Sequence, residues 1–235
     1  MLKFFNYPNL LLLLLFINLT TMESAGFNAE KTKQKTPEKS SECDQLYEEM
    51  ELDSVVNYTA FRYAFLGYNK IDVRNKDIMT LIDFSKPSTE KRFFVLDMQN
   101  KKLLYSTHVS HGKRSGENYA TSFSNKPRSH KSSPGFYITE NTYKGRNGYS
   151  LIINGLEKGI NDRAKERSIV IHGADYCDTS LIDEGGRLGR SFGCPALPVD
   201  ICGPIIDTIK DGTLLYIYVD NTDYLRKSRI LATNR

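Results

Sequence analysis

The sequence predicts a mainly β domain of the sandwich or barrel type with a few short helices, preceded by a small helical segment. Three observations predict it. Short runs rich in β-branched and aromatic residues recur between Thr80 and Gly173, turn formers such as "QNKK" and "YKGRNG" separate them, and a stretch further upstream has apolar residues at helical spacing. The 235 residues, 40% of them hydrophobic and 26% charged, have the composition of one large globular domain with appendages.

The first 25 residues resemble a secretory signal peptide. Lys3 precedes an apolar run from Leu10 to Leu19, and small and polar residues follow up to Ala25, a plausible last residue before cleavage. The run is shorter than the roughly 20 residues of a membrane span, so an uncleaved anchor is the alternative. We therefore expect an exported protein, located in the periplasm or cell envelope.

Residues 26–42 contain almost no apolar side chains and predict a disordered tether. A helical segment, residues 43–78, follows, with a short helix in "CDQLYEEMEL" and a longer one in "NYTAFRYAFLGYNKI". Phe61, Phe65 and Tyr68 share one face of the longer helix, which predicts core packing, and Asn57 is a suitable N-cap.

We assign residues 79–220 to the β domain and residues 221–235 to a C-terminal tail. The expected strands are "TLIDF", "RFFVLDM", "KLLYSTHVS", "GFYITE", "YSLIING", "SIVIHG" and "TLLYIYV". One helix is expected in "PVDICGPIIDTIKDG", where isoleucines recur on one face and Gly212 is a suitable stop. Pro204 fits this helix only if it lies in the first turn.

His172 and Cys194 are the candidate catalytic pair. His172 ends a predicted strand, where it is held rigidly, and Gly173 lets the chain turn away. Cys194 follows Gly193, whose lack of a side chain allows backbone N–H groups to approach a substrate oxygen. A thiol attacks a carbonyl as the thiolate and needs a nearby base or cation. The alternative is a buried structural cysteine and a core histidine.

Other readings of the polar residues are weaker. His172, Cys177 and Cys194, with Asp175, could ligate zinc, but no C-x-x-C pair is present. His111 and His130 lie in polar stretches and are expected to be solvated. The net charge of +4 is mild and forms no basic stripe, so we expect no nucleic-acid partner. Disulfide pairing of Cys43, Cys177 and Cys202 stays open.

The stretch "SIVIHGADY…GRLGRSFGCPALP" resembles the catalytic region of YkuD-like L,D-transpeptidases, with a His-Gly pair after a strand and a Ser/Thr-His-Gly-Cys motif after a loop. Upstream segments such as "RFFVLDM" and "SSPGFY" are similar to the murein L,D-transpeptidase catalytic-domain branch, and the similarity extends over roughly residues 60–219. The resemblance implies a YkuD-like β-sandwich. Phe192 stands where many members have a second histidine, and the loop before Ser191 is slightly longer than usual.

The resemblance also implies roles for individual residues. Cys194 matches the nucleophile, His172 the activating histidine, Gly193 and Gly173 the glycines that help form the oxyanion site and orient the ring, and Ser191 the Ser/Thr of the motif. Arg190 and Arg187 lie close in sequence to the nucleophile and are our candidates for holding substrate carboxylates, because a guanidinium grips a carboxylate through two hydrogen bonds. Otherwise they lie on a solvated loop.

The activity implied is attack on a peptidoglycan tetrapeptide stem through a cysteine thioester, release of the terminal D-amino acid, and transfer of the acyl group to an amine, giving a 3→3 cross-link or an exchanged terminal D-amino acid. Water as acceptor gives an L,D-carboxypeptidase or endopeptidase of peptidoglycan, and a lipoprotein amine gives protein attachment. A non-catalytic wall-binding module is a further alternative. The partners implied are peptidoglycan stem peptides, and no metal or organic cofactor is implied.

Overall fold

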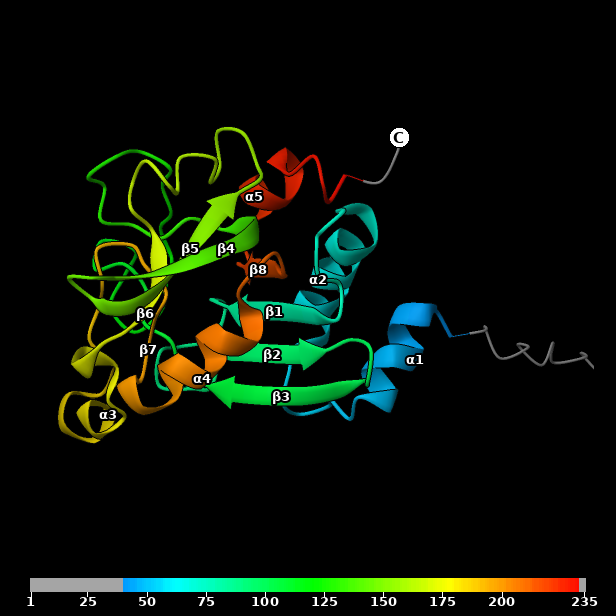
Figure 1. Cartoon of the computed structure of the whole chain (residues 1–235), viewed down its shortest axis with the longest axis horizontal. Helices are drawn as coiled ribbons and strands as arrows, with labels where there is room; N and C mark the ends of the chain where they lie inside the picture. The colour runs from blue at the N-terminus through cyan, green and yellow to red at the C-terminus, as the bar shows by residue number, and fades with distance from the viewer. Residues whose placement is uncertain (1–39, 233–235) are drawn as a thin grey trace, which may run out of the picture. The chain divides into compact units, whose positions relative to one another are not determined.

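A computed structural model describes residues 40–232 (Figure 1). The predicted signal peptide at 1–25 and most of the predicted tether lie outside the described residues. Within residues 40–232, no helix combines the length and the apolar character that crossing a bilayer requires.

The mainly β class with short helices is confirmed. The helices are α1 (Glu42–Glu49), α2 (Tyr58–Lys70), α3 (Ser180–Gly185), α4 (Val199–Ile209) and α5 (Thr222–Lys227), with a 3₁₀ turn at Asp175–Cys177. The strands are β1 (Ile78–Asp83), β2 (Phe93–Asp97), β3 (Lys102–Thr107), β4 (Gly135–Gly145), β5 (Gly148–Gly155), β6 (Val170–Gly173), β7 (Ala196–Leu197) and β8 (Leu214–Tyr218). Each of the seven expected strands is present, and β7 is additional.

The eight strands form one sheet in the order β3-β2-β1-β8-β4-β5-β6-β7. Most neighbours are antiparallel, but β1 pairs with β8 and β6 pairs with β7 in parallel. Strand β8 therefore lies in the middle of the sheet, although it is the last strand in the chain. Figure 1 shows β1, β2 and β3 side by side, with β4 and β5 above them.

The helical segment is fastened to the sheet through α2. Asn57 caps this helix as predicted, since its side chain accepts a hydrogen bond from the Ala60 N–H. Helix α2 packs against β1 and β8, and Gly67 lets it approach closely. A Cβ on Gly67 would lie only 2.0 Å from the ring of Phe136 on β4. That ring is buried and stacks on Tyr216 of β8, with a centroid distance of 4.2 Å.

The structure differs from the sequence expectations at four places. Helix α1 begins at Glu42, with Ser41 as its N-cap, so the end of the predicted tether is helical. The loop before Ser191 contains α3. Pro204 lies inside α4 beyond its first turn, and α4 ends at Ile209, before Gly212. Residues 222–227 of the predicted tail form α5.

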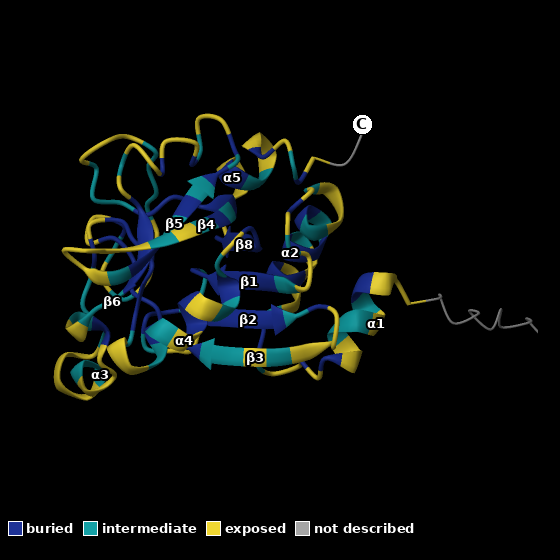
Figure 2. Cartoon of the chain, in the orientation of Figure 1, coloured by how far each residue is buried: buried dark blue, intermediate teal, exposed yellow. Residues whose placement is uncertain are grey.

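The core runs along the middle of the sheet. Strand β8 is buried at every position, and β1 and β2 are buried at all but one position each. Figure 2 shows this band of buried strands, with exposed residues gathered on the loops and on α3. Burial of such apolar side chains is the main favourable contribution to folding. Strands β6 and β7, which carry the candidate site, lie at one end of the sheet, away from this central band.

Candidate active site

The segment of residues 190–197 is held between two other parts of the chain. Strand β7 pairs with β6, so that Ala196 lies opposite His172. On its other side, isolated bridges join the segment to residues 110–112. Cys194 lies two residues before Ala196, and the fold therefore brings the predicted nucleophile next to the strand that carries the predicted base.

The Cys194 thiol is reduced and only 9% exposed. Its sulfur lies 3.6 Å from the carbonyl oxygen of Ser168, to which it donates, and faces the N–H of Val170 on β6. Burial raises the pKa of this thiol above its ordinary value of 9.0, while the Val170 amide and the charge of Arg167 act to lower the pKa. The thiol is thus protonated at neutral pH, and a reaction at the sulfur requires a group that removes its proton.

His172 has the properties of a neutral base. Its Nδ1 donates to the carbonyl oxygen of Gly173 at 2.9 Å, because a carbonyl can only accept. The proton therefore resides on Nδ1, and Nε2 keeps its lone pair. Burial lowers the pKa of the imidazole below 6.5, and the Gly173 contact partly opposes this. No hydrogen bond joins His172 to Cys194 in residues 40–232, so the transfer of a proton requires the thiol to turn from Ser168.

Ser191 and Gly193 fix the turn that leads into Cys194. The Ser191 hydroxyl donates to the Cys194 carbonyl at 2.7 Å and accepts from the Gly193 N–H at 2.9 Å. Gly193 has a φ of +131°, and a Cβ there would lie 2.9 Å from the Lys131 carbonyl oxygen. Its own carbonyl accepts from Ser132. Ser191 thus occupies the Gly193 N–H, whereas the Cys194 N–H lies against its own sulfur.

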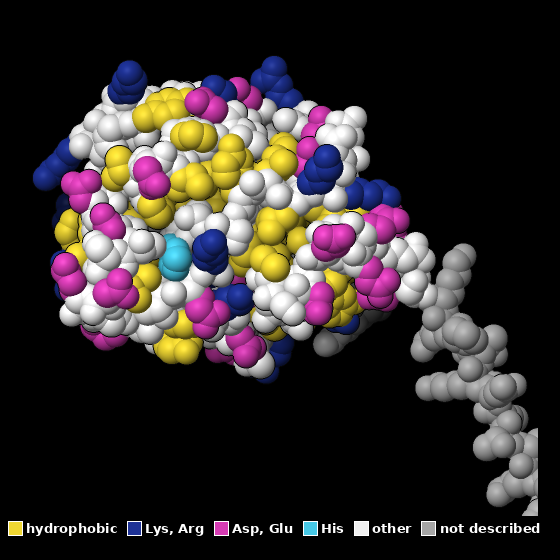
Figure 3. All heavy atoms as spheres, turned by 90° about the horizontal axis from the view of Figure 1, so that it is seen from below, with side chains coloured by type: hydrophobic (Ala, Val, Ile, Leu, Met, Phe, Trp, Pro, Cys, Tyr) yellow, Lys and Arg dark blue, Asp and Glu magenta, His cyan; other side chains and the backbone are white. Residues whose placement is uncertain are grey.

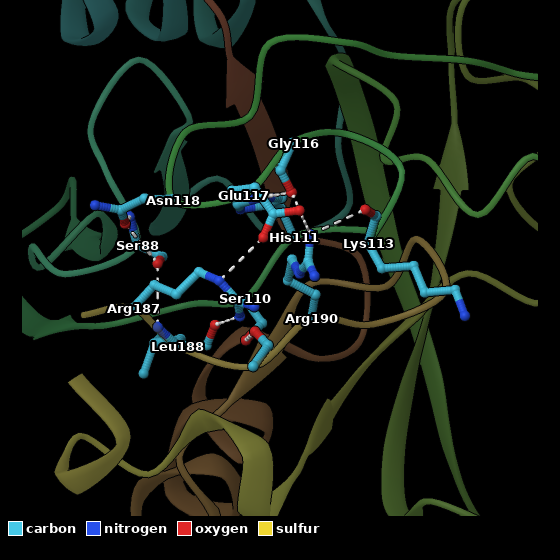
Figure 4. Close-up of polar contacts among 11 residues, drawn as sticks. Ser88, Ser110, His111, Lys113, Gly116, Glu117, Asn118, Arg187, Leu188 and Arg190 are labelled. Atoms are coloured by element: carbon cyan, nitrogen blue, oxygen red, sulfur yellow. Dashed lines mark hydrogen bonds and ion pairs between the residues drawn. The ribbon is translucent and has the colours of Figure 1, made fainter. Parts of the chain in front are cut away.

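Arg187 and Arg190 both pair with one carboxylate, that of Glu117. Arg190 lies 2.6 Å from one carboxylate oxygen and Arg187 lies 3.2 Å from the other. Arg190 also donates to the Gly116 carbonyl at 3.0 Å. Figure 4 shows Glu117 between the two arginine side chains. The two predicted carboxylate-binding residues thus already hold a carboxylate of the protein.

The expectation that His111 is solvated is wrong. His111 is fully buried, and its Nδ1 accepts from Arg92 at 2.8 Å while its Nε2 faces the Gly116 carbonyl at 3.3 Å. Burial and then the Arg92 charge lower the pKa of His111 to about 4. Arg92, also fully buried, donates to the Val109 carbonyl as well. The only local signal for this pair is an arginine at the start of an apolar run, "RFFVLDM".

The residues considered as zinc ligands have other contacts. The buried Cys177 thiol contacts the Ser110 hydroxyl and the Ala196 carbonyl, at 3.0 and 3.2 Å. Across residues 40–232, no group of three or more histidine, cysteine, aspartate or glutamate side chains is arranged to hold a metal ion.

The surface beside the turn is aromatic and basic. Phe192 is 64% exposed, its ring lies 4.6 Å from that of His130, and the Lys113 ammonium lies 4.6 Å from its centroid. His130 is half-buried and its Nδ1 has no partner within the described residues, in contrast to the expectation of a solvated side chain.

On the face shown in Figure 3, acidic and basic side chains are interspersed, without the basic stripe of a nucleic-acid binder.

Comparisons with known proteins place this arrangement in a family. Residues 52–218 match a family model described as the L,D-transpeptidase catalytic domain. Similar solved structures include an L,D-transpeptidase from Mycobacterium smegmatis (13% identity, 61% of this chain and 59% of that chain covered, TM-score 0.37). Others are the helical cell shape determining protein Pgp2 from Campylobacter jejuni (13%, 68% and 57%, 0.41) and an L,D-transpeptidase from Stackebrandtia nassauensis (12%, 77% and 77%, 0.36). No curated protein matches the chain.

The matched region of the family model contains every residue of the candidate site, from His111 to Cys194. The chain spans about three fifths of the length of the first structures it resembles. Their TM-scores are low, so the family assignment rests on the family model.

Proposed function

The chain belongs to the L,D-transpeptidase catalytic domain family, and from that premise we propose that it is a cysteine-dependent acyltransferase acting on peptidoglycan stem tetrapeptides. One observation carries the proposal: a reduced Cys194 at a tightly held turn beside the strand of a neutral His172 with a free Nε2. A nucleophile, a base and a group that orients the base are the elements of covalent acyl transfer.

In the first half-reaction, the Cys194 thiol turns from Ser168 and gives its proton to Nε2 of His172. The sulfur then attacks the carbonyl carbon between the third and fourth residues of the stem. The Cys194 N–H is our candidate donor to the oxyanion that forms, because the Gly193 N–H is occupied by Ser191. The C–N bond breaks, the imidazolium protonates the leaving amine, and a thioester remains.

In the second half-reaction, an acceptor amine attacks the thioester and passes a proton to His172, which returns it to the sulfur. The amine of a second stem gives a 3→3 cross-link, and the amine of a free D-amino acid gives an exchanged terminal residue. Water gives L,D-carboxypeptidase activity, and a lipoprotein amine gives attachment of that protein. Incubation with defined tetrapeptide muropeptides, followed by measurement of product masses, distinguishes these acceptors.

Acylation by a carbapenem tests the role of the cysteine directly. We expect mass spectrometry to find a covalent adduct on the wild-type protein and on Cys43→Ala, a matched control in the distant helix α1, but none on Cys194→Ala. His172→Gln should acylate slower by a factor on the order of 10²–10⁴. An adduct on folded Cys194→Ala, or near-normal acylation of His172→Gln, contradicts the proposal. A wild-type protein that binds isolated cell wall but forms no carbapenem adduct supports a non-catalytic binding module instead.

Because peptidoglycan lies outside the cytoplasmic membrane, we propose that the protein acts in the periplasm or cell envelope, the location for which a signal peptide at 1–25 is predicted. The N-terminal residue of the protein recovered from that compartment tests this. A mature chain that begins at Met1 in the cytoplasm contradicts it.

A further inference from the structure

Arg167, which sequence reasoning did not single out, is a cation beside the predicted nucleophile. It lies in the series of turns at 161–168, three residues before β6 begins at Val170. Its side chain is half-buried, and no carboxylate within residues 40–232 lies at ion-pair distance from it. A guanidinium in this position retains its full charge without a compensating anion of the protein.

The hydrogen bonds of Arg167 all go to a single loop. Its Nη1 donates to the Ser124 carbonyl at 2.7 Å and to the Ser133 hydroxyl, and its Nη2 donates to the Lys131 carbonyl and to the Ser129 hydroxyl at 3.3 Å. Four of the five N–H groups of the guanidinium are therefore used within the protein. Arg167 is poorly suited to grip a substrate carboxylate through two hydrogen bonds, but its charge still acts on its surroundings.

The charge lies against the turn that carries Cys194. Nη2 is 3.3 Å from the position that a Cβ on Gly193 would occupy, so the guanidinium contacts the residue immediately before the nucleophile. The effect between the two groups is mutual, since Arg167 lowers the pKa of the Cys194 thiol and the sulfur raises that of Arg167. His172 is neutral in this environment, so it supplies no charge to the sulfur until it takes the proton.

We propose that Arg167 is a positioning residue that holds a positive charge beside Cys194, stabilises the thiolate formed when the proton passes to His172, and anchors residues 124–133 next to it. The inference rests on the proposed role of Cys194 as the nucleophile. A cation close to a partly buried sulfur favours the charged form, because the low local dielectric weakens screening. Burial alone would otherwise leave this thiol inert.

Alkylation of Cys194 by iodoacetamide as a function of pH tests the proposal, with the Cys194 peptide quantified by mass spectrometry. In Arg167→Gln we expect the midpoint of the profile to move up by about one pH unit, within the range observed for a lost neighbouring charge. Carbapenem acylation near pH 7 should slow by about threefold to tenfold, because the thiolate fraction falls by about tenfold and the higher nucleophilicity of a more basic thiolate offsets part of that loss. Arg167→Lys keeps the charge and should keep most of the wild-type midpoint.

Ser133→Ala is the matched control, because it removes one hydrogen bond between Arg167 and the loop and leaves the charge. Its midpoint should stay within about 0.3 pH units of the wild type, well below the shift expected from loss of the charge. An unchanged midpoint in folded Arg167→Gln overturns the proposal. A shift in Arg167→Lys or Ser133→Ala as large as that in Arg167→Gln overturns it as well, since the loop rather than the charge would then govern the thiol.

The test distinguishes failure of the Arg167 proposal from a folding defect and from failure of the proposed function. If Arg167→Gln does not fold, as judged by thermal unfolding, Arg167→Lys decides, because a folded variant with the charge must keep the midpoint. Alkylation does not require catalysis. A wild-type protein that forms no carbapenem adduct therefore counts against the proposed function, whereas equal alkylation profiles with a normal adduct count against the role of Arg167 alone.

Discussion

The middle of the sheet and the end that carries Cys194 are held together by different forces. In the middle, β1, β2 and β8 bury apolar side chains almost continuously, and Phe136 stacks on Tyr216 beneath helix α2. Close packing of this kind is insensitive to pH and tolerates little change in volume.

At the end with the candidate site, buried polar groups form many of the contacts. Ser191, Ser132 and Arg167 fix the turn and the neighbouring loop by hydrogen bonds, and Arg92 with His111 forms a buried pair nearby. Such networks hold backbone groups at defined positions, but they are costly when a partner is lost. The difference indicates that apolar burial in the middle of the sheet supplies most of the stability of the fold. At the end of the sheet, the hydrogen bonds serve mainly to position the Cys194 thiol.

The largest effect on stability is expected where apolar packing is densest. Phe136→Ala removes a fully buried ring that touches Gly67 and Tyr216, so we expect a loss of about 3–5 kcal/mol in the free energy of unfolding. Denaturant unfolding measures it. The loss should be equal at pH 7 and pH 5.5, because no titrating group is removed.

Leu104→Ala is the control for this variant. Leu104 lies on β3 at the edge of the sheet and is 40% exposed, so its truncation should cost below about 1 kcal/mol. A Phe136→Ala variant that unfolds with the same free energy as Leu104→Ala would show that the middle of the sheet is not the stabilising region.

Acid should act on the polar end through His111. The folded protein keeps this imidazole neutral down to about pH 4, whereas the unfolded chain takes up the proton near pH 6.5. Between these values the unfolded state binds more protons, so the contribution of His111 is complete above pH 6.5 and is lost as the pH falls toward 4. The change amounts to about 3 kcal/mol.

Comparison with His111→Gln isolates this contribution, since buried Asp83 and Glu157 have raised pKa values and act in the opposite direction. We expect the stability difference between the wild type and His111→Gln to shrink by about 3 kcal/mol from pH 7.5 to pH 4. A difference that does not vary with pH would mean that His111 titrates normally in the folded protein.

The same division separates what the sequence predicted from what it did not. Strands with continuous β-branched runs, such as "RFFVLDM" and "TLLYIYV", were identified because their signal is local. Their pairing was not, since the parallel contact of β1 with β8 joins residues more than a hundred positions apart. Strand β7 has two residues, too few for any periodicity to show.

At the site, the flanking glycines pointed to Cys194 and His172, and the fold brings their segments together. The polar neighbours of His111 suggested solvent, but its burial depends on Arg92, which immediately precedes β2 and is distant in the sequence. Arg167 gave no signal, because its effect depends on the loop at 124–133 and on the turn at Gly193, neither of which is adjacent to it in the sequence. Residues that act through partners distant in the sequence can be identified only once the fold is known.

The smallest effect is expected at the exposed ion pairs beside the polar end. Glu117→Gln removes a mostly exposed carboxylate, and such pairs are screened by water and salt, so the melting temperature should move by less than about 2 °C. The KM for a tetrapeptide stem should fall by about twofold to threefold. In the wild type the Glu117 carboxylate occupies Arg187 and Arg190, and its loss leaves both free to bind a substrate carboxylate. Glu49→Gln, which breaks the exposed pair with Lys101 beside helix α1, is the control and should leave KM unchanged. A KM that rises in Glu117→Gln would indicate that Glu117 holds the arginines in place for the substrate rather than competing with it.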